Sequence, residues 1–401
     1  MTQAFSGIRI IDFTQVIAGP FAIQQLALLG ADVVKIEQPV VGDQTRGLMN
    51  AGEHHGPGMS PTFMSCNLGK RSLALDLKAP EAAAIVTALV RDADVVAENF
   101  RPGVMERLGF GYDAMHRINP AIVYCSISGY GQTGPRADIP AYDGAIQADS
   151  GMMSINGHPE TGPTRTGYMP VDMSTALNTA FAISAALYRR LATGEGQRLD
   201  IAMLDTALVM QAPQISNFLV QGETPGLIGN RSPTGQPTAN VFPTADGHMN
   251  VIALRDAQVR TLFELVGHTE ALEQPDWATA AARMRHYDAV YALLAEALGK
   301  KTTAQWLALF AEHGLPAAAI REFPEVVADP QLEHRAVFAE TPSPLDHEQT
   351  VRLIRAGYIT DNDGPSVHRP APLLGEHSGE ILTELGYDPA TIAELKKSGV
   401  I

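Results

Sequence analysis

The sequence predicts an α/β protein with two domains: a larger, Rossmann-like domain built on a parallel sheet, and a smaller α+β domain. Strand-like and helix-like segments alternate along the first third of the chain, which is typical of parallel strands joined by covering helices. After Gln221 the sequence becomes rich in Gly, Pro, Thr and Asn, which we interpret as a linker into the second domain. The length of 401 residues and the 45% hydrophobic content agree with about two to three globular domains.

Short apolar runs separated by Gly and Pro define the elements of the N-terminal third. The first strand is predicted at 8–13, and a helix with apolar residues at helical spacing follows the Gly19–Pro20 breaker and ends at Gly30. A second helix runs from Pro80 to about residue 90, because proline is tolerated in a first helical turn. Further buried strands are predicted at 33–37, 94–98, 122–127 and 198–203.

The remaining elements are mostly helical. A long helix is predicted over 174–191, and another follows the last strand as far as about residue 220. The linker covers 222–247, and a mostly helical stretch continues to about residue 324. These patterns place the large domain at 1–221, and the linker with the small α+β domain at 222–330.

Charge and cysteine content limit the partners and the compartment. Lys plus Arg number 29 against 44 for Asp plus Glu, so the net charge of −15 disfavours nucleic acid and anionic membranes as partners. The first 110 residues are nearly balanced in charge, so an anionic ligand would be tolerated there. Two cysteines cannot build a disulfide framework, no signal peptide is visible, and Pro, Gln or Asn interrupts the longest uncharged stretches. We therefore expect a cytoplasmic protein without a membrane span.

The common cofactor and nucleophile motifs do not occur. The turn after the first strand, 14–20, has no G-x-G-x-x-G, so a nicotinamide cofactor is not expected despite the Rossmann-like pattern. The segment 67–72 lacks the first glycine of a phosphate-binding loop. The histidines and cysteines show no metal-ligand spacing, and no G-x-S-x-G elbow of a serine hydrolase is present. We expect no metal site.

Two kinds of charged residue stand out: basic residues in loop-like positions, and an aspartate just ahead of a long helix. Taken alone, a set of basic residues in loop-like positions is typical of a solvated surface. The set comprises Arg46, Lys70, Arg71, Lys78, Arg101 and Arg107. Asp172 lies just ahead of the long apolar helix, and an aspartate there is typical of a helix N-cap.

Several segments match a known family when they are taken together. They are 12–14 with 18–20, 30–39, 42–46, 67–72, 76–78, 98–103, 128–135, 142–143, Asp172 and 372–377. With these motifs the chain resembles the class III CoA-transferase family, which includes formyl-CoA transferase and carnitine CoA-transferase. The likeness runs nearly the whole length and is weakest between about 222 and 330.

The resemblance implies an architecture that composition does not show. Each subunit would be a ring with a central hole, and two rings would thread each other in an interlocked, ring-like homodimer. The large domain would take both chain ends, so that 331–401 returns to it after the small domain.

The resemblance also changes the interpretation of Asp172, which matches the nucleophile of the family. A free aspartate is ionised at neutral pH, and burial at a helix start would replace its water by fixed N–H dipoles. The implied reaction moves CoA from an acyl-CoA to a free carboxylic acid through mixed anhydrides and an aspartyl-CoA thioester. CoA and acyl-CoA are then substrates, and no tightly bound cofactor or metal is needed.

Further site residues follow from the resemblance by position. Contacts to CoA are implied for Val16, Leu75, Lys78, Asn99, Phe100, Arg107 and Met203. Of these, Lys78 and Arg107 would pair with the phosphates of CoA. The acyl side is implied for Ile17, Tyr142, Asp143, Gly235 and Gln236.

The sequence does not decide the substrates, and two alternative functions stay open. Formyl-CoA transferase has a glutamine in place of Ile17, so a larger and partly apolar acyl group is expected here. Our hypothesis is succinyl-CoA as donor and a small dicarboxylate as acceptor. An α-methylacyl-CoA racemase shares the fold but needs a Gly-His-Asp motif, where this chain has Tyr142–Asp143. A catalytically silent acyl-CoA-binding protein would be expected to have lost Asp172.

Overall fold

The chain divides into two compact units in the computed structural model, which describes residues 3–48, 58–346 and 348–401. Unit 1 comprises residues 1–152, 166–223 and 331–401, and unit 2 comprises residues 153–165 and 224–330. The segment 153–165, which the sequence pattern placed in the large domain, therefore belongs to unit 2. Each unit is described by itself below.

Unit 1 is built around a parallel sheet of six strands within the described residues. The strands are β1 (Arg9–Asp12), β2 (Asp32–Glu37), β3 (Arg71–Ala74), β4 (Val95–Glu98), β5 (Val123–Ser128) and β8 (Gln197–Ala202). Their order is β3-β2-β1-β4-β5-β8, and every neighbouring pair is parallel. This is the doubly wound Rossmann order, in which the direction of winding reverses between β1 and β4.

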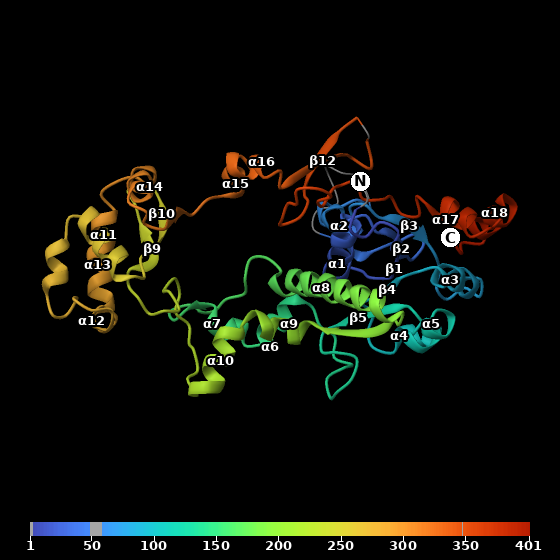
Figure 1. Ribbon diagram of the computed structural model, residues 1–401, viewed down its shortest axis with the longest axis horizontal. Helices are drawn as coiled ribbons and strands as arrows, with labels where there is room; N and C mark the ends of the chain where they lie inside the picture. Colours follow the sequence, from blue (N-terminus) through green and yellow to red (C-terminus); the bar gives the residue numbers. More distant parts are fainter. Residues whose placement is uncertain (1–2, 49–57, 347) are drawn as a thin grey trace. The chain divides into compact units, whose positions relative to one another are not determined.

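Both faces of this sheet are buried, and the strand sequences show why. Successive side chains of a strand point to opposite faces, so a strand covered on both sides is a nearly continuous apolar run. In β1, Ile10 belongs to the core on one face and Ile11 to the core on the other. The helices of residues 18–27 and 170–193 cover the Ile10 face, while those of 82–91, 112–118 and 378–397 cover the Ile11 face (Figure 1).

The helices of unit 1 lie mainly in the connections between these strands. They are α1 (Ala18–Ala27), the 3₁₀ helix η1 (Gln44–Arg46), α2 (Pro61–Cys66), α3 (Ala82–Arg91), α4 (Val104–Leu108), α5 (Tyr112–Ile118), α6 (Asp143–Asp149), α8 (Pro170–Thr193), α9 (Met203–Met210), α10 (Ala212–Gln221), α17 (Ser378–Glu384) and α18 (Pro389–Lys397). A hairpin of β12 (Phe338–Pro342) and β13 (Thr350–Ile354) completes the unit. None of the helices in the described residues combines the length and the apolar character needed to cross a bilayer.

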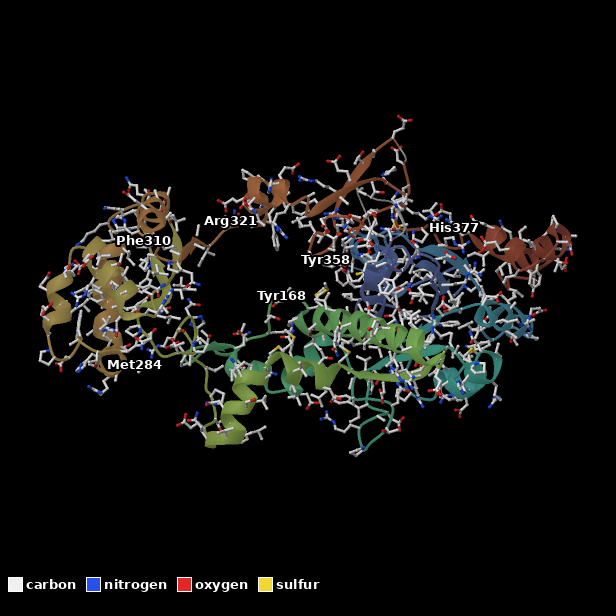
Figure 2. All side chains as sticks on the ribbon, viewed as in Figure 1. Tyr168, Met284, Phe310, Arg321, Tyr358 and His377 are labelled. Carbon is white, nitrogen blue, oxygen red and sulfur yellow. The ribbon has the colours of Figure 1, made fainter. Side chains whose placement is uncertain are left out.

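The C-terminal segment closes the edge of the sheet at β3. The backbone N–H of His377 (labelled in Figure 2) donates to the carbonyl of Ser72 at 3.0 Å, and the Ser378 hydroxyl accepts from the N–H of Ala74 at 3.1 Å. Ile381 and Leu395 pack into the same apolar core as α3. Residues more than 300 positions apart therefore share one core.

Unit 2 contains two small antiparallel sheets and a group of helices. Its strands are β6 (Gly157–His158), β7 (Gly162–Pro163), β9 (Ala239–Pro243), β10 (His248–Ile252) and β11 (Ala317–Ala319), paired as β6-β7 and β11-β10-β9. Its helices are α11 (Asp256–Leu265), η2 (Thr269–Glu273), α12 (Ala280–Arg285), α13 (Tyr287–Leu298), α14 (Thr303–Glu312) and α15 (Phe323–Val327), while α7 (Met152–Ile155) and α16 (Pro330–His334) cross the boundaries between the units. Phe242, Phe263 and Phe310 centre its core (Phe310 is labelled in Figure 2).

Three helix starts differ from the predicted ones. Helix α3 begins at Ala82, so Pro80 precedes the helix and does not open it. Helix α1 begins at Ala18, so Gly19 and Pro20 lie inside its first turn and do not precede it. The first turn has no partner for its N–H groups, and proline is therefore accepted there. Helix α8 begins at Pro170, four residues before the predicted start, because proline supplies a preformed first helical residue.

Candidate active site

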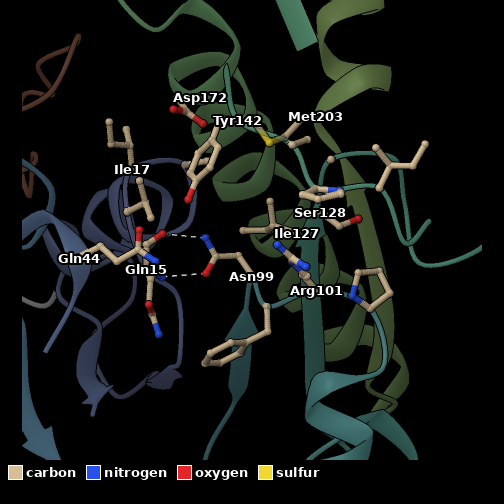
Figure 3. Close-up of a pocket in the computed structure, with 18 of the residues that line it drawn as sticks. Gln15, Ile17, Gln44, Asn99, Arg101, Ile127, Ser128, Tyr142, Asp172 and Met203 are labelled. Atoms are coloured by element: carbon tan, nitrogen blue, oxygen red, sulfur yellow. Dashed lines mark hydrogen bonds between the residues drawn. The ribbon is translucent and has the colours of Figure 1, made fainter. Parts of the chain in front are cut away.

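A pocket of about 270 Å³ lies at the carboxyl ends of β1, β4, β5 and β8, where the winding of the sheet reverses. Ligands of doubly wound folds bind at this switch point, because the loops after two neighbouring strands diverge there and leave a crevice. The lining comes from the turn after β1, the turn after β4 and the loops around Gly129 and Tyr142 (Figure 3). It comprises Gln15, Val16, Ile17, Ala18, Gln44, Asn99, Phe100, Arg101, Pro102, Ile127, Ser128, Gly129, Ala137, Ile139, Pro140, Ala141, Tyr142, Asp172 and Met203.

Two side chains from the loops after β4 and β2 hold the turn after β1. The Asn99 side chain accepts from the N–H of Gln15 and donates to its carbonyl, each at 2.7 Å, as Figure 3 shows. The N–H of Val16 donates to the Asp43 carboxylate at 3.1 Å. Val16 has φ of 72°, in the left-handed region that a β-branched residue rarely adopts. The turn is therefore fixed from both sides in a strained conformation.

Asp172 lies in the first turn of α8 and lines the pocket beside Tyr142 and Met203. It does not cap this helix, so the N-cap interpretation was wrong. The carboxylate of Asp143 takes that role: it accepts from the N–H of Val171 at 2.9 Å and from the N–H of Asp172 at 3.1 Å. The cap thus comes from another helix, α6, and leaves the Asp172 side chain available to a ligand.

The electrostatics of Asp172 differ from those of a surface carboxylate. No donor among the described residues hydrogen-bonds its side chain. Burial, and then the neighbouring Asp143 carboxylate, raises the pKa of Asp172 to about 7. A carboxylate of this basicity is a better nucleophile than an ordinary aspartate, and near neutral pH part of it is already ionised.

Asp143 is itself fixed by side chains of unit 1. The Gln147 amide donates to the Asp143 carboxylate, and the Gln147 oxygen accepts from the N–H of Thr166 at 3.1 Å and from the hydroxyl of Thr166 at 3.2 Å. Asp143 and Gln147 are both buried. This chain of contacts ties α6 to the segment that enters α8, and it places two carboxyl groups next to each other.

If Asp172 reacts as an anion, its raised pKa predicts a pH profile. We expect kcat/KM for acyl-CoA to fall about tenfold per pH unit below about 7 and to level off above it. In Asp143→Asn the amide oxygen still caps α8, but the neighbouring negative charge is gone, so the pKa of Asp172 falls and the acidic limb moves to lower pH. Steady-state rates from pH 5 to 9 measure both profiles. Equal midpoints in the two proteins would contradict the coupling.

Buried ion pairs of unit 1 correct the interpretation of three basic residues as solvated. Lys70 pairs with Asp12 at 2.8 Å, with both side chains 0% exposed. Arg46 makes a two-pronged contact with Glu37, with both bonds at 2.7 Å. Arg71 is also buried, between carboxylates of β2 and α17. The other three, Lys78, Arg101 and Arg107, are exposed as expected.

Seven of the predicted site residues meet in the pocket, and the others lie elsewhere. Those that line it are Val16, Ile17, Asn99, Phe100, Tyr142, Asp172 and Met203. Asp143 is outside the lining but accepts a hydrogen bond from the backbone N–H of Asp172. Leu75 is buried in the core, and Lys78 and Arg107 are exposed outside the lining. Gly235 and Gln236 belong to unit 2, where Gly235 has φ of 71° and Gln236 is 8% exposed.

Several lining residues were not predicted as site residues. Gln15 and Arg101 flank predicted ones, Gln44 lies in the loop after β2, and Ile127 and Ser128 end β5. The Ser128 hydroxyl is buried and has no hydrogen-bond partner among the described residues, so it can serve a ligand. The signal that could have found them is their place at the carboxyl end of a predicted parallel strand. The described residues hold no group of three His, Cys, Asp or Glu side chains suited to a metal ion.

The protein has a doubly wound fold, a carboxylate in its switch-point pocket and no nicotinamide-binding turn. Comparison with known proteins identifies the enzyme family. The model of CoA-transferase family III matches residues 5–378, and the chain belongs to this family. It is 37% identical over 383 residues to the succinate–glutarate CoA-transferase of Agrobacterium fabrum, covering 95% of each chain. It is 36% identical to the acetyl-CoA:oxalate CoA-transferase of Acetobacter aceti, covering 96% of this chain and 97% of that one.

The fold is also similar to solved structures. A CAIB/BAIF family protein from Brucella suis superposes with a TM-score of 0.86 at 33% identity, covering 96% of this chain and all of that one. The likeness therefore extends over both units and over nearly the whole sequence.

Proposed function

We propose that the protein transfers CoA from an acyl-CoA thioester to a free carboxylic acid, with Asp172 as the covalent carrier. The observation that carries this proposal is the Asp172 carboxylate, which lines the switch-point pocket and has no hydrogen-bond donor among the described residues. A carboxylate without bound donors keeps its lone pairs available for attack on a carbonyl carbon. Its position in the first turn of α8 also places the developing charges near the positive end of a helix of 24 residues.

The reaction proceeds in four balanced displacements. An Asp172 oxygen attacks the carbonyl carbon of the donor thioester, the C–S bond breaks, and CoA thiolate leaves a mixed anhydride. The thiolate then attacks the Asp172 carboxyl carbon, which releases the donor acid and leaves an aspartyl-CoA thioester. The acceptor carboxylate attacks that carbon and expels the thiolate again, giving a second anhydride. The thiolate finally attacks the acceptor's acyl carbon, which frees the Asp172 carboxylate.

The pocket has groups that suit these steps. The free hydroxyl of Ser128 can donate to the oxygen that gains charge in each displacement. Ile17 is 7% exposed and gives the acyl side an apolar wall. We assign Val16, Leu75, Asn99, Phe100 and Met203 to CoA contacts, and Lys78 and Arg107 to the CoA phosphates, which need cationic partners. Tyr142, Asp143, Gly235 and Gln236 are assigned to the acyl side.

We assign succinyl-CoA as donor and a small dicarboxylate as acceptor. The names of the relatives support this choice, since one is a succinate–glutarate CoA-transferase and another, from Homo sapiens and 34% identical, is a succinyl-CoA:glutarate CoA-transferase. Arg101 is exposed at the pocket and is a cation that a second carboxylate could reach.

We also assign an interlocked homodimer. The outer face of α8 supports an association, because Leu177, Phe181, Tyr188 and Leu191 form one apolar stripe at helical spacing. Their exposures run from 56% to 82%, which is unusual for large apolar side chains grouped on one helix.

Mass spectrometry of the CoA esters tests the proposed reaction. The purified protein is incubated with succinyl-CoA and a panel of carboxylic acids, and every ester is identified. New CoA esters without net hydrolysis are expected, and they name the acceptor. Unchanged esters with several donors would contradict the transferase. Solvent deuterium at the α-carbon of the acyl group would then indicate a racemase instead.

A further inference from the structure

The turn that carries Val16 is the least relaxed part of the pocket wall. Val16 has φ of 72°, a conformation that glycine adopts freely and a β-branched residue does not. Its N–H is bound by one carboxylate oxygen, Asp43 Oδ1, at 3.1 Å. Contacts from the rest of the fold must therefore hold Val16 in this backbone conformation, which valine disfavours.

Asp43 is placed to do so. Its Oδ1 also accepts from the N–H and the hydroxyl of Thr45, at 2.9 and 2.8 Å. Its Oδ2 pairs with Lys35 Nζ at 3.0 Å, and both side chains are 0% exposed. Lys35 Nζ donates in addition to the carbonyl of Thr14 at 2.7 Å. A closed ring of contacts thus runs from Thr14 through Val16 and Asp43 to Lys35 and back.

This ring joins two parts of the pocket wall. Val16 is in the turn after β1, and Gln44, which follows Asp43 directly, lines the same pocket from the loop after β2. Asp43 and Lys35 are themselves outside the lining, so they cannot act by touching a ligand there.

We propose that the acceptor oxygen of the buried Asp43 side chain positions the active-site turn, by holding Val16 in its left-handed conformation, and that Lys35 neutralises the buried charge of Asp43. Burial lowers the pKa of Lys35, but the carboxylates of Asp43, Asp12 and Glu37 outweigh it and raise that pKa, so the pair stays charged. The catalytic consequence rests on the proposed function, whereas the structural role does not.

Two charge-neutral double variants separate this role from simple loss of a buried ion. Lys35→Met with Asp43→Asn keeps an oxygen that accepts from Val16, while Lys35→Met with Asp43→Val removes it. Hydrogen exchange of the amides in 14–18, followed by mass spectrometry, is expected to match the parent in the Asn pair. In the Val pair it should be about ten- to one-hundred-fold faster, the range that corresponds to release of one strained residue. Equal exchange in both pairs would overturn the proposal.

Catalysis gives the second readout. The Val pair should lose about ten- to one-hundred-fold in kcat/KM and the Asn pair less than about fivefold. Equal losses in the two pairs would contradict the positioning role. If the parent transfers no CoA, the proposed function fails, but the exchange pattern still decides on the turn.

A single substitution covers the case in which the Val pair does not fold. Val16→Gly in the parent removes the strain itself and should raise the melting temperature. An unchanged or lower melting temperature would mean that Val16 carries no strain for Asp43 to hold.

Discussion

Asp172→Asn should reduce kcat for CoA transfer by at least about 10³-fold and leave the fold intact. The amide nitrogen and oxygen cannot form the anhydride, because a neutral amide oxygen is a very weak nucleophile and the side chain carries no negative charge to be lost on attack. The α8 cap is unaffected, since it comes from Asp143. Circular dichroism and CoA binding should match the parent protein.

The chain offers a matched control in Asp205. It occupies the third position of α9, as Asp172 does in α8, but it is exposed and outside the pocket lining. Asp205→Asn should keep full activity. With succinyl-CoA alone, the parent should also show an acyl or CoA adduct on the peptide that contains Asp172, and Asp172→Asn should show none. Full transfer by Asp172→Asn would refute the covalent mechanism.

Lys70→Met should lower the free energy of unfolding by about 3–5 kcal/mol, which is the largest effect on stability that we expect from substituting a buried residue. Methionine fills the space but leaves the Asp12 carboxylate buried without its partner, and both side chains are 0% exposed in the parent. Lys70 also donates to the Pro20 carbonyl and to Asn67, both at 2.9 Å, so the start of α1 loses a contact as well. The melting temperature should fall by about 4–6 °C.

The double variant Lys70→Met with Asp12→Asn is the control for this effect. It removes both charges and keeps an acceptor for the Thr14 N–H and hydroxyl, which bind Asp12 at 2.9 and 2.5 Å. It should be more stable than Lys70→Met alone, because no unpaired charge remains buried. Denaturant unfolding of the three proteins measures the difference. A double variant no better than the single one would show that the charge of Asp12 is not the cause.

The sequence predicted the sheet better than it predicted the surroundings of the pocket. Five of the strands of the large sheet were found, since each carries apolar residues in a run or, as in β8, in alternation. Strand β3 was missed because Arg71 and Ser72 make up half of it. Both side chains are polar but buried: Arg71 meets carboxylates, and the Ser72 hydroxyl donates to Glu37 at 2.7 Å. With only two apolar residues left, this strand of four residues gave no recognisable pattern, and the partners that bury its polar half lie far away in the sequence.

The candidate site was also predictable only in part. Asp172 and most pocket residues follow from the resemblance, and the parallel sheet brings the ends of β1 and β4 together. The cap by Asp143 could not be foreseen, because it depends on how α6 packs against α8, 29 residues further on. The burial of Arg46 and Lys70 was equally hidden: a basic residue in a loop is usually solvated, and only the folded chain supplies Glu37 and Asp12 as partners.

The return of the C-terminal segment to β3 has a consequence for synthesis on the ribosome. The face of the nascent sheet that carries Ile11, Leu73 and α3 is completed only by Ile381 and Leu395. At roughly 5–20 residues per second, about 15 to 60 s pass between the emergence of α3 and that of α17. During this interval the N-terminal third presents an uncovered apolar surface, so synthesis of the segment that carries α17 and α18, and not synthesis of the Rossmann segment, sets when this core can be completed.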